Sequence, residues 1–334
     1  MRKYILILFI ALSQWVSSAS LHEQLQNLSD QAQIQLITCT QGEQVWSKYG
    51  HSGIRIIDPV QDIDIVFNYG IFNLMSDDFY IKFVKGETYY QLGIEDYEHF
   101  VQFYGSIGRR IYWQEFNLTQ EQKLRIADAL MVNYQPENRH YLYNFVFDNC
   151  ATRPYYLIKN ALQDTIISDY KGFCGTDYRT AISHYTGSNS WVDFGINLVF
   201  GSDADVPMTN EQRLFLPEEL MRYFAQAKLS DGTSLVKTSN IGDFDVVEVP
   251  WYANCWPVIC IFAILMTLLS YYDRRRKRLS WGVDAALGFI YLILIALVIF
   301  LTFFSCHPLV GFNWRLILFP TIHLCARLVY FVHR

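Results

Sequence analysis

The sequence predicts an exported α+β domain that is held at a membrane by α-helical transmembrane segments. Residues 1–20 have the basic start, apolar centre and small-residue end of a secretory signal peptide. Residues 21–249 mix charged residues with strand-like and helix-like apolar patterns, so we expect them to form an extracytoplasmic catalytic domain. Residues 250–272 and 285–306 contain no charged residue, and each is long enough to cross about 30 Å of hydrocarbon.

A basic cluster sets the orientation of these membrane segments. Residues 274–278 read RRRKR, and positively charged loops stay on the cytoplasmic side of a membrane. This explanation is stronger than a nucleic-acid-binding patch, because the cluster lies between two apolar stretches. Residues 250–334 are therefore expected to form a multi-pass domain of the cytoplasmic (inner) membrane, with the catalytic domain on the periplasmic or extracytoplasmic face. The spans are expected at about residues 251–272, 285–305 and 316–332.

A β-hairpin is predicted near the start of the exported domain. Residues 49–59 begin with Gly-His and end in an Asp-Pro turn, and residues 63–70 alternate in the manner of a return strand. In that register His51 lies across from about Asn68 or Tyr69.

The clearest helix begins after Thr119, which has Gln122 three residues on and so forms a capping-box pattern, and runs to about residue 134. The other expected elements are a helix at residues 21–33, a strand at 34–39, a short helix or strand at 79–84, a strand at 88–93, helices at 155–162, 177–184 and 217–227, a Gly- and Asp-rich connection at 195–205 and an extended segment at 234–249.

Cys150 is the candidate nucleophile, because it stands at or near the start of the helix predicted at residues 155–162. A helix start presents unpaired N–H groups and a partial positive charge, which stabilise a thiolate and can bind an oxyanion. Asp148 and Asn149 are expected to be turn and capping residues. The alternative for Cys150 is a buried thiol without chemistry.

His51 is the candidate base. A lone His at the start of a strand is more often a packing residue, but a strand-borne His that precedes a helix-start Cys supplies the parts of a thiol acyltransferase or peptidase. A third polar group must then orient the imidazole. The hairpin register favours Asn68 and Tyr69 for this role, with Asp148 as an alternative, although a carboxylate beside Cys150 would raise the thiol pKa.

The remaining cysteines and arginines suggest further contacts. No CxxC pair or His/Cys cluster indicates zinc, so no metal or cofactor is expected. Cys39 and Cys174 could pair in an oxidising compartment and leave Cys150 free. Arg153 and Arg179 are candidate ligands for a phosphate or carboxylate group of the substrate, with an ordinary salt bridge as the alternative for each.

Four blocks of the sequence resemble the Lnb family, lipoprotein N-acyltransferases whose extracytoplasmic domain is anchored by C-terminal membrane helices. The blocks are YGHSGIRIIDP at residues 49–59, DIVFNYGIF at 64–72, DNCATRP at 148–154 and WVDFG at 191–195. The order of His before Cys is also similar to the permuted branch of the papain-like (NlpC/lecithin:retinol acyltransferase-like) fold, to which the lecithin:retinol acyltransferase-like enzymes belong. Ordinary NlpC-type cell-wall peptidases place the Cys first. The permuted order favours lipid acyl transfer over peptide cleavage by analogy of fold.

The resemblance implies a reaction in two steps. His51 deprotonates Cys150, and the thiolate takes an acyl group from a glycerolipid ester, either a phospholipid or the lipoprotein's own sn-2 chain. The α-amine of the lipoprotein's N-terminal cysteine then attacks the thioester. The implied partners are bacterial lipoproteins, membrane acyl chains and the bilayer, with no nucleic acid. The competing interpretations are a cell-wall cysteine peptidase or amidase and a non-catalytic envelope interaction protein.

Overall fold

The computed structural model describes residues 21–72, 78–245, 247–278 and 280–313. They divide into two compact units. Unit 1 comprises the described residues of 1–74, 89–172 and 210–244, and unit 2 those of 75–88, 173–209 and 245–334. The predicted signal peptide at residues 1–20 and the predicted third span at 316–332 lie outside the described residues.

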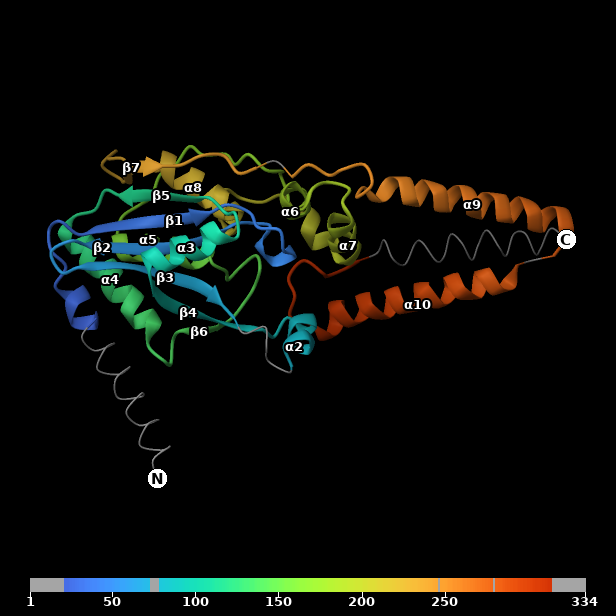
Figure 1. Cartoon of the computed structure of the whole chain (residues 1–334), viewed down its shortest axis with the longest axis horizontal. Helices are drawn as coiled ribbons and strands as arrows, with labels where there is room; N and C mark the ends of the chain where they lie inside the picture. Colours follow the sequence, from blue (N-terminus) through green and yellow to red (C-terminus); the bar gives the residue numbers. More distant parts are fainter. Residues whose placement is uncertain (1–20, 73–77, 246, 279, 314–334) are drawn as a thin grey trace, which may run out of the picture. The chain divides into compact units, whose positions relative to one another are not determined.

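A seven-stranded antiparallel sheet forms the centre of unit 1, with the strand order β6-β4-β3-β2-β1-β5-β7 (Figure 1). The predicted hairpin and the strands expected at residues 34–39 and 88–93 are confirmed, whereas β5 and β6 were not predicted. The strands are β1 (Gln33–Cys39), β2 (His51–Asp58), β3 (Ile63–Ile71), β4 (Tyr89–Asp96), β5 (Ile111–Phe116), β6 (His140–Leu142) and β7 (Val236–Asn240).

Helices cover both faces of this sheet, because alternate side chains of each strand are apolar on each face. On one face, Ile54 and Phe67 belong to the main core, which also includes buried residues of α4 (Gln120–Tyr134), α5 (Thr152–Leu162) and α8 (Pro217–Gln226). The other face carries a smaller cluster, formed with two aromatic residues of α3 (Tyr97–Ser106). The side chains of His51, Asn68 and Glu95 described below lie on this second face, whereas Cys150 packs against the main core.

Two local predictions in unit 1 can be compared with the structure directly. The capping box of Thr119 and Gln122 is present at the start of α4, so that helix is confirmed. The helix predicted at residues 21–33 is shorter and covers residues 21–26. The chain leaves the helix there because the amide and hydroxyl of Ser29 both donate to the carboxylate of Asp58, each at 2.7 Å.

Unit 2 is helical. Its helices are α2 (Phe79–Lys85), α6 (Tyr178–Thr186), α7 (Trp191–Val199), α9 (Cys255–Arg276) and α10 (Trp281–Phe304). Three short 3-10 helices complete the described elements of the two units: η1 (Val45–Ser47), η2 (Ser202–Asp205) and η3 (Gln212–Phe215). Helices α9 and α10 are long and apolar enough to cross a membrane, and they correspond to the first two predicted spans.

Helix α7 corrects one prediction, because residues 195–205 were expected to be an irregular connection. Gly195 lowers the helix propensity of this stretch. The helix nevertheless forms, since Ser190 caps it by accepting a hydrogen bond from the amide of Asp193 at 3.0 Å, and the Asp193 side chain makes several hydrogen bonds of its own.

Candidate functional site

Cys150 lies two residues before the first residue of α5 and so near the start of this helix, as the sequence predicted. The side chain of Asn149 caps the start of this helix: its Oδ1 accepts hydrogen bonds from the amides of Ala151 at 2.8 Å and Thr152 at 2.9 Å. The capping prediction for Asn149 is therefore confirmed. The same contacts correct the expected oxyanion site, because these two helix-start amides already have an acceptor.

A different amide influences the Cys150 thiol. The backbone amides of Ser52, on β2, and of Cys150 itself both lower the pKa of the thiol. One of these amides belongs to the sheet and the other to the turn before α5. The residue that follows His51 in the chain therefore acts electrostatically on the candidate nucleophile.

Three adjacent strands hold a hydrogen-bonded row of polar side chains that begins at His51. Nε2 of His51 lies 2.6 Å from Oδ1 of Asn68 on β3, and Nδ2 of Asn68 donates to Oε1 of Glu95 on β4 at 2.5 Å. The register explains the row: Asn68 pairs with Gly53, two residues from His51, and Glu95 pairs with Val66, two residues from Asn68. Residues two apart on a strand point to the same face, so all three side chains meet on one face of the sheet.

This row determines which imidazole nitrogen is free. Because Nδ2 of Asn68 donates to Glu95, it is the oxygen of the Asn68 amide that faces His51. An amide oxygen only accepts, so Nε2 of His51 carries the proton and Nδ1 is left with its lone pair. The ring is therefore in the tautomer in which Nδ1 can accept a proton.

Gly70 lies beside both Cys150 and His51. A Cβ built on Gly70 would be 3.8 Å from Cβ of Cys150 and 3.9 Å from Cε1 of His51. The backbone at Gly70 has φ +94°, which glycine adopts without strain. The absence of a side chain here leaves open space next to both residues.

An aromatic ring and a buried cation complete the site. The ring of Tyr104, on α3, stacks on the His51 ring with centroids 5.7 Å apart and planes at 13°. The guanidinium of Arg109 lies 4.8 Å from the Tyr104 ring centroid, and its Nε donates to the carbonyl of Thr40 at 2.6 Å. Arg109 is 7% exposed, and its Nη2 has no hydrogen-bond partner among the described residues.

Burial is the main influence on both titrating groups. It lowers the pKa of His51 to about 4, with a further lowering by the charge of Arg109, while the hydrogen bond that His51 donates to Asn68 acts in the opposite direction. Burial also raises the pKa of the Cys150 thiol, although the Ser52 amide and Arg109 partly offset this. At neutral pH the site therefore holds a thiol and a neutral imidazole, which suits proton transfer during attack better than a preformed ion pair.

Two family models match the sequence. The model of the Lnb N-terminal periplasmic domain matches residues 22–182, and the model of the Lnb transmembrane domain matches residues 250–334. The chain belongs to the Lnb family. No curated protein and no solved structure matches it. The first match contains all the residues of the thiol site, and the second contains α9 and α10, so this Lnb-family chain combines a periplasmic domain with membrane-spanning helices.

The alternative third groups of this Lnb-family chain lie elsewhere in unit 1. Tyr69 belongs to the main core, on the face opposite to Asn68, and burial raises its pKa. The prediction that Tyr69 assists His51 is therefore corrected: its neighbour Asn68 makes the contact. Asp148 forms a two-pronged ion pair with Arg153, at 2.6 and 2.8 Å.

The two candidate anion-binding arginines are both held by carboxylates. Besides its ion pair with Asp148, Arg153 stacks on Tyr141 at 3.6 Å. Arg179, in unit 2, pairs with Asp205 at 2.6 Å and donates to Oδ1 of Asn197 at 2.9 Å. These contacts agree with the salt-bridge alternative, and substrate binding by either arginine stays a prediction.

Cys39 is a fully buried thiol at the end of β1, across the ladder from His51. The Cys39–Cys174 disulfide that the sequence left open is therefore not formed in this structure. Burial also raises the pKa of Cys39, which leaves Cys150 as the partly exposed thiol of unit 1. Within the described residues, no group of three or more His, Cys, Asp or Glu side chains is placed to hold a metal ion.

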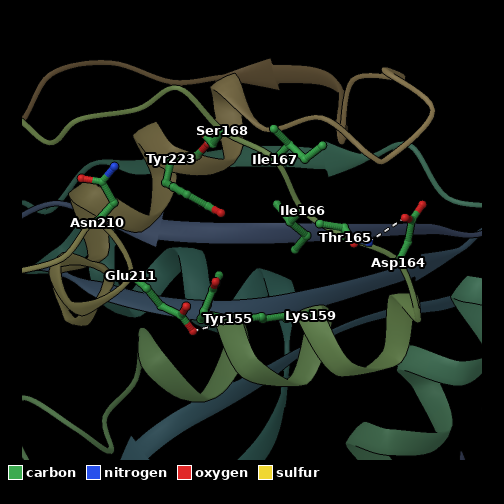
Figure 2. A pocket seen from close by; sticks show the side chains of 10 residues that line it. All are labelled: Tyr155, Lys159, Asp164, Thr165, Ile166, Ile167, Ser168, Asn210, Glu211 and Tyr223. Atoms are coloured by element: carbon green, nitrogen blue, oxygen red, sulfur yellow. Dashed lines mark hydrogen bonds and ion pairs between the residues drawn. The ribbon is translucent and has the colours of Figure 1, made fainter.

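Two cavities open beside α5, and neither is lined by Cys150 or His51. One, of about 550 Å³, is lined by Tyr155 and Lys159 of α5 and by Tyr223 and Glu211, with Lys159 paired to Glu211 at 2.8 Å (Figure 2). The other, of about 620 Å³, lies between α4 and α5 and includes the Asp148–Arg153 pair.

Three residues of the site were not predicted from the sequence: Glu95, Tyr104 and Arg109. Glu95 had a usable signal, because the strand predicted at residues 88–93 needs only two more residues to bring it beside Asn68. Tyr104 and Arg109 had none, since α3 and the turn after it were not predicted.

Proposed function

We propose that this chain is a membrane-anchored lipoprotein N-acyltransferase that carries a fatty acyl group as a thioester on Cys150. The observation that carries the proposal is that Gly70 lies beside both Cys150 and a His51 ring whose Nδ1 is free to accept a proton. Membership of the Lnb family supports acyl transfer to lipoproteins as the reaction class.

The first step forms the thioester. The sulfur of Cys150 attacks the carbonyl carbon of a glycerolipid ester while Nδ1 of His51 accepts the thiol proton. The tetrahedral intermediate carries its negative charge on the former carbonyl oxygen, and the groups proposed to stabilise it are those that lower the pKa of the Cys150 thiol, the Ser52 amide and the positive charge of Arg109. The C–O bond then breaks, and His51 returns its proton to the leaving glyceryl oxygen.

The second step transfers the acyl group. The α-amine of the lipoprotein's N-terminal cysteine attacks the thioester carbonyl, and Nδ1 of His51 accepts the proton that the amine loses. The C–S bond breaks, and the sulfur takes that proton back as the thiol. The products are an amide and the original enzyme, so every proton is accounted for without a cofactor.

The anchor fits a substrate whose acyl chains stay in the bilayer, because attachment to α9 confines the catalytic unit to the membrane surface. The acyl donor in this proposal is either the lipoprotein's own sn-2 chain or a separate phospholipid. A permuted papain-like fold is part of the same proposal, supported by the order of His before Cys and by a helix that starts at the nucleophile and packs on an antiparallel sheet.

An acyl-enzyme assay tests this function. The purified full chain, in nanodiscs, is incubated with a diacylglyceryl lipopeptide or a phospholipid whose sn-2 chain carries an alkyne, and the protein mass is measured after acid quench. We expect an acyl adduct that neutral hydroxylamine removes. Cys150→Ala should abolish it, and Cys260→Ala, which removes an exposed thiol of α9, should leave it intact.

The same assay separates the competing functions. The lipid that supplies the tagged chain identifies the donor. An adduct of equal size on Cys150→Ala, or cleavage of cell-wall peptides in place of acylation, would contradict the proposal. His51→Gln should slow adduct formation, whereas His99→Gln, at an exposed position of α3, serves as its control.

A further inference from the structure

Helix α7 of unit 2 presents an apolar surface to its surroundings. Among its nine residues, all of which the structure describes, Asp193 alone is buried. The side chains of Trp191 and Phe194 are exposed by 46% and 39%. A surface helix in water has the opposite arrangement, with apolar residues inward and charged residues outward.

The buried carboxylate of Asp193 accepts several hydrogen bonds, and these stabilise the arrangement in which the charged residue of α7 points inward and its apolar residues point outward. Its oxygens accept hydrogen bonds from the hydroxyl of Ser183 at 2.5 Å, the hydroxyl of Thr186 at 3.1 Å, the amide of Asn189 at 3.0 Å and the side chain of Asn197 at 2.9 Å. The polar groups of this region thus satisfy one another inside the unit and leave the apolar side chains on its surface.

Both ends of α7 are bonded to the boundaries of the spans. Before the helix, Asn189 accepts from the amide of Cys255 and from the indole of Trp256, the first residues of α9, each at 2.9 Å. Near its end, the carbonyl of Leu198 accepts from the side chain of Asn313, which follows α10, at 2.7 Å. Helix α7 is therefore fixed where α9 begins and where α10 has ended.

Helix α2 is attached in the same way to the C-terminal end of α10 (Figure 1). The carbonyl of Lys85 accepts from the amide of Cys306 at 2.7 Å, and the carbonyl of Phe83 accepts from Nε2 of His307 at 2.7 Å. Among the α2 side chains that the structure describes, the exposed apolar ones are Ile81, Phe83 and Val84, at 63%, 48% and 42%.

These attachments lie on one side of the membrane. The basic loop at residues 274–278 joins the other ends of α9 and α10 and belongs to the cytoplasm. The start of α9 and the end of α10 are therefore extracytoplasmic, and both carry a helix with outward apolar residues. We propose that α2 and α7 lie in the extracytoplasmic leaflet of the bilayer, with their exposed apolar side chains among the lipid acyl chains.

The occupant of this surface is lipid because the surface continues the lipid-facing surface of the spans. Helices α9 and α10 also expose mostly apolar side chains, and a helix that lies flat at the boundary buries such residues in the leaflet. The proposal holds whatever reaction Cys150 performs, so it can be tested without an activity assay.

Photolabelling from within the bilayer tests the proposal. The full chain is placed in nanodiscs of phosphatidylethanolamine and phosphatidylglycerol that carry a diazirine either midway along an acyl chain or on the headgroup. After irradiation, lipid adducts are mapped by peptide mass spectrometry. We expect adducts from the acyl-chain probe on peptides that contain α2 and α7, as well as on α9 and α10.

Matched variants sharpen the test. Phe194→Asp should lower the acyl-chain adducts on α7 by about tenfold, because a carboxylate is strongly disfavoured among acyl chains, and should leave those on α9 and α10 unchanged. Ile81→Asp should do the same for α2. Gly195→Ala, at an exposed α7 position where an added Cβ meets nothing within 4 Å, should leave all adducts unchanged.

Two results would overturn the proposal. Adducts on α2 and α7 from the headgroup probe alone, or acyl-chain adducts confined to α9 and α10, would place these helices outside the leaflet. Copy-to-copy cross-links through α2 or α7 in place of lipid adducts would assign the surface to a second copy. If an Asp variant does not fold, adducts on α9 and α10 are lost as well, and the depth of labelling in the unsubstituted protein decides the question.

Discussion

The side-chain oxygen of Asn68 lies 2.6 Å from Nε2 of His51 and determines which imidazole nitrogen is free. Glu95 holds the Asn68 amide in the orientation that presents this oxygen, at 2.5 Å from the amide nitrogen. Nδ1 of His51 is therefore the nitrogen that can take the thiol proton. This relationship crosses three neighbouring strands, so the proton acceptor of the site is set by the sheet itself.

Loss of the Asn68 side chain should impair the reaction without unfolding the protein. Asn68→Ala removes the group that fixes the tautomer, and we expect the turnover rate of acyl transfer to fall by roughly tenfold to a hundredfold. Glu95→Gln keeps an oxygen that can accept from Asn68, so its effect should be smaller. A turnover rate for Asn68→Ala equal to that of the unsubstituted protein would show that the ring is oriented by other contacts.

Arg109 should set the pH range of activity. Its positive charge lowers the pKa of His51 and of the Cys150 thiol, so Arg109→Gln should raise both pKa values. Activity requires neutral His51, and the acid limb of the pH dependence of kcat/KM, expected near pH 4, should therefore move upward in the variant.

The pKa of the Cys150 thiol can be measured directly as a second test of the role of Arg109. The rate of Cys150 alkylation by iodoacetamide, followed as a function of pH, should show a higher thiol pKa in Arg109→Gln. Arg110→Gln is the matched control, because Arg110 donates to the carbonyl of Asp243 rather than contributing to the shifts of the site. Unchanged pH profiles in Arg109→Gln would exclude an electrostatic role for this residue.

Asp58 should stabilise unit 1 through its hydrogen bonds. Burial alone would raise its pKa, but hydrogen bonds from Ser29, Val60 and Gln61 hold the pKa below its ordinary value. Asp58→Ala removes the buried acceptor of these hydrogen bonds and should lower the free energy of unfolding by about 2 kcal/mol.

The sign of the pH dependence follows from the lowered pKa of Asp58. The stabilisation is fully present above the ordinary carboxyl pKa and is lost as the pH falls through the lowered value. Denaturant unfolding of the full chain in detergent at several pH values measures both effects. Asp30→Ala, at an exposed position, should be neutral, and equal stabilities of the two variants would contradict the role given to Asp58.

The sequence was informative about the two reacting groups because local patterns carry them. The alternation of β2 and β3 and the helix after Cys150 were both visible as periodicities. The choice between Asn68 and Tyr69 could not be made from the sequence, because a shift of one residue in the register moves a side chain to the other face of the sheet. The sequence also did not show that the amides expected to bind the oxyanion already donate hydrogen bonds to the side chain of Asn149.

The other parts of the site depend on contacts between distant segments. The charge of Arg109 acts on His51 and Cys150 only because β5 places the preceding turn beside the end of β1, where the carbonyl of Thr40 accepts a hydrogen bond from Nε of Arg109. Helix α7, which is not part of the site, was missed because Gly195 weakens the local helix signal. The hydrogen bonds that stabilise it are donated to the Asp193 side chain by Ser183 and Thr186, which precede the helix. Neither arrangement has a short-range signature.

The most direct test of the central claim is the mass of the N-terminal lipopeptide of a host lipoprotein. The measurement compares cells that lack this gene with the same cells carrying the unsubstituted protein, Cys150→Ala or Cys260→Ala. We predict an N-acylated terminal cysteine with the unsubstituted protein and with Cys260→Ala, and a free α-amine in the other two. N-acylation that persists with Cys150→Ala at the unsubstituted level would contradict the assignment of Cys150 as the acyl carrier.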